Sequence, residues 1–211
     1  MPEVDIPFIV KICGITNEED ARAAVHAGAN ALGFNFYPKS PRYIALARAR
    51  AIAECVPSSV LSVGVFVNAS EEELIEASST VPLDVLQVHG EFVASHLAGS
   101  FRVWRAIQAS APPAFFDPQI EAHLLDSTTA QYGGSGTTFD WMLAAAFPFR
   151  KIVAGGLDPD NVAEAIRVAR PWGVDASSRL ESKPGKKDPA RVAQFIQAAV
   201  MAFRQPQRVS R

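Results

Sequence analysis

The sequence predicts a single-domain (β/α)8 barrel, the architecture known as a TIM barrel. Short apolar segments rich in β-branched residues alternate with longer segments of helical composition along the whole chain. Strands that alternate with helices at this spacing pair in parallel. We count eight strand–helix units, and that number favours a closed barrel over an open doubly wound sheet. With 211 residues, the barrel is compact beside a usual length of about 250.

In the first half of the chain, capping and turn signals bound the elements. Strands are expected at residues 8–13, 31–36, 62–68 and 84–89, and helices at 18–27, at 45–56, from 70 onward and at 92–98. Thr16 or Asn17 caps the first helix, and Gly28 ends it. Two prolines interrupt residues 37–43, which therefore form a loop. Ser70 opens the third helix in the manner of a capping box.

In the second half, strands are expected at 102–107, 122–126, 151–154 and 173–177, and helices at 113–121, 139–147, 158–169 and 188–203. Asp158 and Asp188 each precede a proline, and proline suits the first position of a helix. Residues 127–138 are rich in Ser, Thr and Gly, and residues 178–187 are charged, so both segments are expected to be loops.

Composition limits the class of protein. With 48% hydrophobic residues and no change in composition along the chain, we expect one domain over 1–203 and a polar tail over 204–211. A net charge of −2 gives no reason to expect a nucleic-acid partner. No apolar run of about 18 residues predicts a membrane span. The acidic start is unlike a signal peptide and there are two cysteines, so a cytoplasmic location is the simplest expectation.

The first strand carries an unusual pair of side chains on one face. Lys11 and Cys13 alternate with Ile12, so they point to the same side of the strand. Buried lysines are rarely unpaired, and Asp175 on the adjacent eighth strand is the expected partner of Lys11. Buried free cysteines are more often small hydrophobes than catalysts, although nearby positive charge can make a thiol a base.

A carboxyl group ends the sixth strand. Asp126 follows Leu124 and Leu125, where an aspartate is often only a turn cap. In an apolar surrounding it can instead stay protonated and act as a general acid. Because the first and sixth strands lie on different sides of a barrel, Cys13 and Asp126 together suit proton transfer through a substrate held between them.

A phosphate site is expected at the last two strand ends. Gly155 and Gly156 end the seventh strand, and Ser177 and Ser178 end the eighth. Loops at these positions commonly bind phosphate in such barrels, and glycine lets backbone N–H groups approach the anion. Ordinary helix-start chemistry is the alternative interpretation. The glycine run 133–136 is weak evidence by itself.

Polar residues at other strand ends complete the candidate site. Arg42 follows the second strand and can pair with a carboxylate on the same ligand. Gln87 and His89 share a face of the fourth strand, and with Asp175 they are expected to contact the substrate. No second histidine or cysteine stands at ligand spacing from His89, so no metal site is expected. No G-x-G-x-x-G follows the first strand, as a nicotinamide or flavin site would require.

The chain resembles the phosphoribosylanthranilate isomerase family. The resemblance lies in segments that occur in the family's order over nearly the whole chain: 11–16, 33–44, 64–68, 86–90, 125–127, 132–137, 154–157, 174–178 and 184–188. It implies a cofactor-free barrel of tryptophan biosynthesis that converts phosphoribosylanthranilate by an Amadori rearrangement. It further implies that Asp126 is the general acid, Cys13 the general base and Arg42 the anthranilate contact, with the phosphate near Gly155–Gly156 and Ser177–Ser178. The expected oligomeric state is a monomer or a homodimer.

One residue departs from the family pattern. Arg179 stands where the family usually has glycine after Ser177–Ser178, so either the position needs no positive φ or the loop differs.

Two other functions remain as alternatives to the isomerase. A phosphosugar lyase or aldolase of this type would need a Schiff-base lysine, for which Lys11 is the interior candidate. A non-catalytic phosphosugar-binding barrel is the other alternative.

Overall fold

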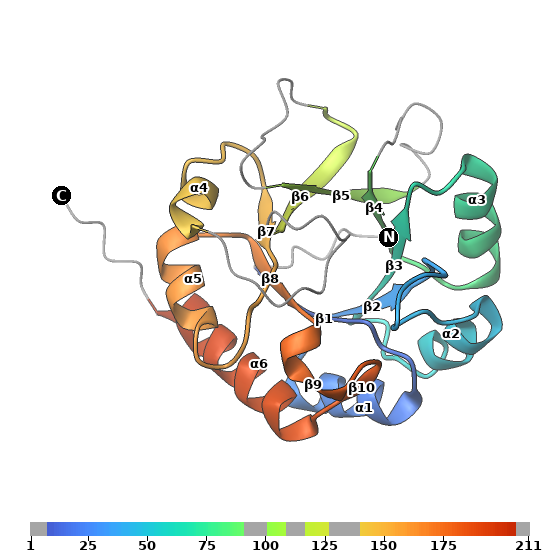
Figure 1. Ribbon diagram of the computed structural model, residues 1–211, viewed down its shortest axis with the longest axis horizontal. Coiled ribbons are helices and arrows are strands. Elements are labelled where there is room, and N and C mark those ends of the chain that lie inside the picture. The colour runs from blue at the N-terminus through green and yellow to red at the C-terminus, as the bar shows by residue number, and fades with distance from the viewer. Residues whose placement is uncertain (1–7, 91–100, 109–116, 127–139, 206–211) are drawn as a thin grey trace.

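A computed structural model describes residues 8–90, 101–108, 117–126 and 140–205. Its centre is a closed barrel of parallel strands in the order β1 to β8, and β1 pairs with β8 (Figure 1). The strands are β1 Ile9–Cys13, β2 Ala31–Asn35, β3 Leu61–Val67, β4 Val85–His89, β5 Arg102–Gln108, β6 Ile120–Asp126, β7 Lys151–Val153 and β8 Gly173–Ala176. The predicted barrel is therefore confirmed.

Helices lie outside the ring of strands (Figure 1). The described helices are α1 Glu18–Ala27, α2 Leu46–Ala53, α3 Glu71–Thr80, α4 Trp141–Ala145, α5 Val162–Ala169 and α6 Pro189–Arg204. Ser70 forms the expected capping box, with its side chain bonded to the backbone of Glu73. The helix expected at 92–98, the loop 127–138 and the glycine run 133–136 lie outside the described residues. No helix in the described residues is long and apolar enough to cross a membrane.

Strand alternation sorts the core into two layers. On β1, Ile9 belongs to the cluster inside the barrel, and Val10 and Ile12 belong to the cluster between barrel and helices. Lys11 and Cys13 follow the parity of Ile9 and therefore face the interior. On β6, Leu124 belongs to the interior cluster, and Asp126, two residues further along the strand, therefore faces the interior as well. The polar residues of the sequence pattern are thus directed toward the barrel axis.

Three local expectations need correction. The helix expected from 158 begins at Val162, because the Asp158 carboxylate accepts bonds from the backbone N–H groups of Asp160 and Asn161 and forms a turn. Residues 117–119 of the helix expected at 113–121 are turn, and β6 begins at Ile120.

The charged segment 178–187 is ordered rather than an open loop. It contains a short 3-10 helix, Ser178–Leu180, followed by the antiparallel strands β9 Glu181–Lys183 and β10 Lys186–Lys187. The hairpin lies beside α1 (Figure 1). Thr16 donates a hydrogen bond to the carbonyl of Gly185, and the backbone N–H of Lys187 donates to the buried Asp20 carboxylate at 2.8 Å.

Candidate active site

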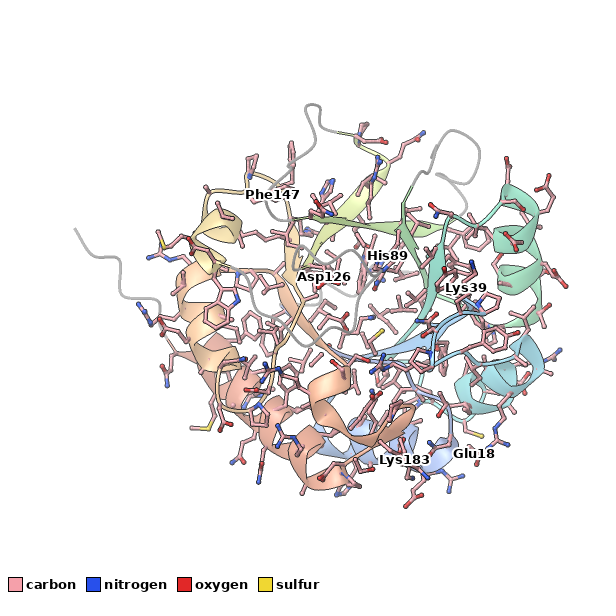
Figure 2. The ribbon with its side chains drawn as sticks, in the orientation of Figure 1. Glu18, Lys39, His89, Asp126, Phe147 and Lys183 are labelled. Atoms are coloured by element: carbon pink, nitrogen blue, oxygen red, sulfur yellow. The ribbon has the colours of Figure 1, made fainter. Side chains whose placement is uncertain are left out.

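A cavity of about 530 Å³ opens at the C-terminal ends of the barrel strands. The strand ends and the loops that follow them bring every residue of the predicted site to its wall. These are Cys13, Arg42, Gln87, His89, Asp126, Gly155, Gly156, Asp175, Ser177 and Ser178. Figure 2 shows His89 and Asp126 inside the ring of strands, and Glu18 and Lys183 outside it. One site, rather than several scattered groups, is therefore assembled from strands that are distant in sequence.

Lys11 forms a buried ion pair beneath the cavity. Its Nζ atom lies 2.9 Å from Asp175 Oδ1, and β1 and β8 place these two residues in register. The expected pairing is thus confirmed. Burial lowers the pKa of Lys11, but Asp175 and Cys13 outweigh it, so the pKa is raised overall. A charged amine has no lone pair for Schiff-base formation, and this disfavours the aldolase alternative.

The Cys13 thiol lies directly beside that lysine. A Cβ atom added to Gly33 would meet Cys13 Sγ at 2.8 Å and Lys11 Nζ at 3.0 Å, so the two groups share one small space. Burial raises the pKa of Cys13, and the charge of Lys11 opposes this without overcoming it. The positive charge that was expected to lower the thiol pKa is present, but burial outweighs it.

Asp126 faces the same cavity from another side of the barrel. It ends β6, which is separated from β1 by β7 and β8 in the closed sheet. The residue is only partly buried. A carboxyl and a thiol therefore line one hollow from different strands, and a small molecule between them can exchange protons with both.

Gln87, which is buried, and His89, which is partly buried, form a polar pair on β4. Gln87 Nε2 and His89 Nε2 lie 2.9 Å apart. Burial, assisted by the charge of Lys11, lowers the pKa of His89 to about 4, so the ring is neutral at physiological pH. Gln87 Oε1 is buried without a hydrogen-bond partner among the described residues and can accept one from a ligand. No group of three or more His, Cys, Asp or Glu side chains suited to a metal ion occurs in the described part of the chain.

The ends of β7 and β8 form adjacent turns at the cavity wall. Gly155 and Gly156 have backbone φ angles of +79° and +63°, which residues other than glycine rarely adopt. The Asn161 amide donates to the Gly156 carbonyl at 2.9 Å and fixes this turn. Ser177 Oγ donates to the Cys13 carbonyl at 3.0 Å and fixes the other. Such glycine turns let backbone N–H groups approach an anion closely.

Arg179, the residue that departs from the family pattern, joins these two turns. It belongs to the 3-10 helix after β8 and is not among the residues with positive φ, so no glycine is required here. Its Nη1 atom lies 2.9 Å from Asp158 Oδ2, in the loop after β7. The substitution therefore adds an ion pair between the two loops.

Two buried charged residues of the site were missed by sequence reasoning. Glu181 accepts hydrogen bonds from Arg42 Nε and Nη2, each at 2.8 Å, and Lys187 Nζ lies 2.9 Å from Glu181 Oε1. The sequence signals were the density of charge in 178–187 and, for Lys187, its place in 184–188, one of the segments that resemble the family. Their roles depend on the hairpin, which folds that segment back toward Arg42.

Fold and site together define a barrel enzyme that acts on a small anionic substrate by acid–base chemistry. Residues 10–198 match the family described as N-(5'phosphoribosyl)anthranilate (PRA) isomerase. A curated relative from Solibacter usitatus, N-(5'-phosphoribosyl)anthranilate isomerase, is 48% identical over 202 residues, covering 93% of this chain and 99% of the relative. The chain belongs to the phosphoribosylanthranilate isomerase family.

Solved structures give the same result. A phosphoribosylanthranilate isomerase in complex with reduced 1-(o-carboxyphenylamino)-1-deoxyribulose 5-phosphate superposes with a TM-score of 0.77 at 38% identity, and covers 92% of this chain and 99% of its own. A structure of monomers generated from the dimeric enzyme of Thermotoga maritima has a TM-score of 0.76 at 38% identity, with the same coverage of 92% and 99%.

Proposed function

We propose that Cys13 and Asp126 perform the proton transfers that isomerise N-(5-phosphoribosyl)anthranilate to 1-(2-carboxyphenylamino)-1-deoxyribulose 5-phosphate. The chain is an isomerase of tryptophan biosynthesis, as its family membership shows. The observation that supports these two roles is the placement of thiol and carboxyl on different strands around one cavity. The reaction moves hydrogen within one molecule, so its balance requires no external oxidant or reductant.

Asp126 begins the reaction as general acid. Its carboxyl proton passes to the ribose ring oxygen, the C1–O bond breaks, and the ring opens to a protonated imine. The positive charge of that imine withdraws electrons from C1 and acidifies the hydrogen on C2. Asp126 is left as a carboxylate, which needs contact with solvent, and its partly buried position at the cavity wall suits this.

Cys13 then acts as general base. The thiolate removes the proton from C2, the electron pair forms the C1–C2 double bond, and the imine nitrogen becomes a neutral amine. The resulting enolamine gives the ketone when C1 gains a proton and the C2 hydroxyl loses one. Burial disfavours the thiolate, whereas Lys11 and the cationic imine both favour it.

The remaining wall residues bind the two ends of the substrate. Arg42 pairs with the anthranilate carboxylate. The turns at Gly155–Gly156 and Ser177–Ser178 hold the phosphate. Gln87 and His89, the latter neutral, bond the polar groups between these ends. Gln87 Oε1 takes a hydroxyl or amine hydrogen that none of the described residues supplies. Asp175, which lines the cavity, contacts the substrate and also holds Lys11.

For the molecule as a whole, we propose one catalytic domain over 1–203 that works in the cytoplasm as a monomer or homodimer. Both cysteines are free, and this suits a reducing compartment. The dimeric state of the Thermotoga maritima relative makes the homodimer a concrete alternative to the monomer. No nucleic-acid or membrane partner is proposed.

The direct test is turnover by the purified chain. With freshly prepared phosphoribosylanthranilate, the fluorescence of the substrate should disappear at a rate proportional to protein concentration. Borohydride added during turnover should leave no covalent adduct on Lys11. Thermal stabilisation by the substrate without turnover would instead support a binding barrel, and a trapped Lys11 adduct would support an aldolase.

The raised pKa of Cys13 predicts the pH dependence. The base is the thiolate, which prevails only above the thiol pKa. In the pH profile of kcat/KM, the rising limb should therefore have a midpoint above the ordinary pKa of cysteine. Lys11→Met removes the charge that lowers this pKa and should move the limb to higher pH. Lys151→Met, at the opposite end of the barrel, should leave it in place. A limb that Lys11→Met does not move would contradict the assignment.

A further inference from the structure

Behind the cavity wall, two buried side chains of the β9–β10 hairpin hold Arg42 in a fixed position. The Glu181 carboxylate accepts from Nε and Nη2 of Arg42 along one edge of the guanidinium, and the two side chains are only 4% and 12% exposed. Lys187 Nζ, 1% exposed, bonds the same carboxylate. Neither Glu181 nor Lys187 is among the described residues that line the cavity, whereas Arg42 lines it.

The same lysine connects Arg42 to the other end of the site. Lys187 Nζ lies 3.3 Å from the carbonyl oxygen of Ser177 and 3.5 Å from its Oγ. Ser177 Oγ in turn donates to the Cys13 carbonyl. The stem of Arg42 passes close to the turn after Cys13, since a Cβ on Gly14 would meet Arg42 Cδ at 2.6 Å. One continuous set of contacts thus runs from the thiol strand to the guanidinium.

The charges of this cluster do not cancel. Arg42 and Lys187 are two basic groups, and Glu181 is one acid. Burial lowers the pKa of Lys187, but Glu181, 2.9 Å from Nζ, favours its charged form. Lys11 is already matched by Asp175. Among the described residues none bonds Arg42 Nη1, so one donor edge remains available while the opposite edge is held. A guanidinium that is fixed beforehand loses less side-chain entropy when it binds a carboxylate.

We propose that Glu181 and Lys187 are positioning residues that set Arg42 for the carboxylate of the substrate, an inference that rests on the proposed function of Arg42. Glu181 holds one edge of the guanidinium, so that the Nη1 side meets the ligand. Lys187 offsets the charge of Glu181, which would otherwise repel the incoming carboxylate. The cluster keeps one net positive charge, and the substrate carboxylate neutralises it.

The test compares two stable ligands that differ in one group. The first is the reduced product analogue, and the second is its counterpart made with aniline, which lacks the carboxyl group. Dissociation constants are measured by calorimetry. Glu181→Ala should weaken the carboxyl-bearing analogue by about tenfold or more, the range of a lost charge-assisted contact. It should change the binding of the other analogue by less than about threefold.

Double variants show whether Glu181 acts through Arg42. The pair Arg42→Ala/Glu181→Ala should bind the carboxyl-bearing analogue no more weakly than Arg42→Ala alone. Because Glu181→Ala leaves Lys187 buried and unpaired, Glu181→Ala/Lys187→Met serves as a second variant without that charge, and it should show the same selective loss. Glu164→Ala removes the partner of an exposed arginine, Arg167, and is the matched control with no expected effect on either ligand.

Each outcome has a distinct meaning. If Glu181→Ala and Glu181→Ala/Lys187→Met each weakened both analogues equally, the positioning role would be overturned. The isomerase assignment would remain intact as long as these variants turned over phosphoribosylanthranilate at the wild-type rate. Additive losses in Arg42→Ala/Glu181→Ala would also overturn it. A wild-type chain that does not turn over phosphoribosylanthranilate would contradict the proposed function itself.

Discussion

Replacing Cys13 with alanine is expected to lower kcat by about 10²–10⁴-fold, the usual contribution of a positioned general base. Cys13 is 9% exposed and borders the cavity, so losing its sulfur removes little packing. The fold should therefore survive, with an unchanged circular dichroism spectrum. The measurement is the rate at which substrate fluorescence is lost at saturating substrate.

Cys55 provides the matched control for this variant. It is the other free cysteine and is exposed, so Cys55→Ala should keep the wild-type rate. Cys13→Ser should also be nearly inactive, because a hydroxyl is a far weaker acid than a thiol and is not ionised at these pH values. A Cys13→Ala chain that works within a few-fold of wild type would remove the thiol from the mechanism.

Replacing Asp126 with asparagine is expected to lower kcat by a similar factor of about 10²–10⁴. The amide keeps the size of the carboxyl group but carries no acidic proton, so the ring oxygen cannot be protonated at a useful rate. Binding of the reduced product analogue should change little, because this ligand needs no proton transfer. The measurements are turnover by fluorescence and binding by calorimetry.

Asp140→Asn is the control for this change. Asp140 caps α4 by accepting from the backbone of Met142, and asparagine caps helices equally well. Its rate should equal that of the wild type. If Asp126→Asn turned over substrate as fast as Asp140→Asn, another group would have to supply the proton.

Most of the fold and the set of wall residues could be read from local pattern. Alternation along β1 places Lys11 and Cys13 on one face whatever the rest of the chain does. Parallel strands in a closed barrel then carry all their C-terminal ends to the same mouth. These two geometric facts suffice to bring Asp126, which is distant in sequence, to the cavity of Cys13.

What escaped prediction depends on contacts between segments distant in sequence. The segment 178–187 looks like a solvated charged loop until its hairpin meets α1 and Arg42, where Glu181 and Lys187 become buried partners. The start of α5 was misplaced because the Asp158 carboxylate bonds backbone groups of a turn instead of opening the helix at once. The thiol pKa depends on the depth of burial, which the sequence does not specify.

Single-turnover kinetics with substrate deuterated at C2 test the two roles most directly. If Asp126 opens the ring, Asp126→Asn slows a step in which no C2 bond breaks, so its rate should be the same for both isotopes. If Cys13 removes the C2 proton, Cys13→Ser slows that step, so its residual rate should show a large primary isotope effect. A large isotope effect in Asp126→Asn together with none in Cys13→Ser would contradict the account.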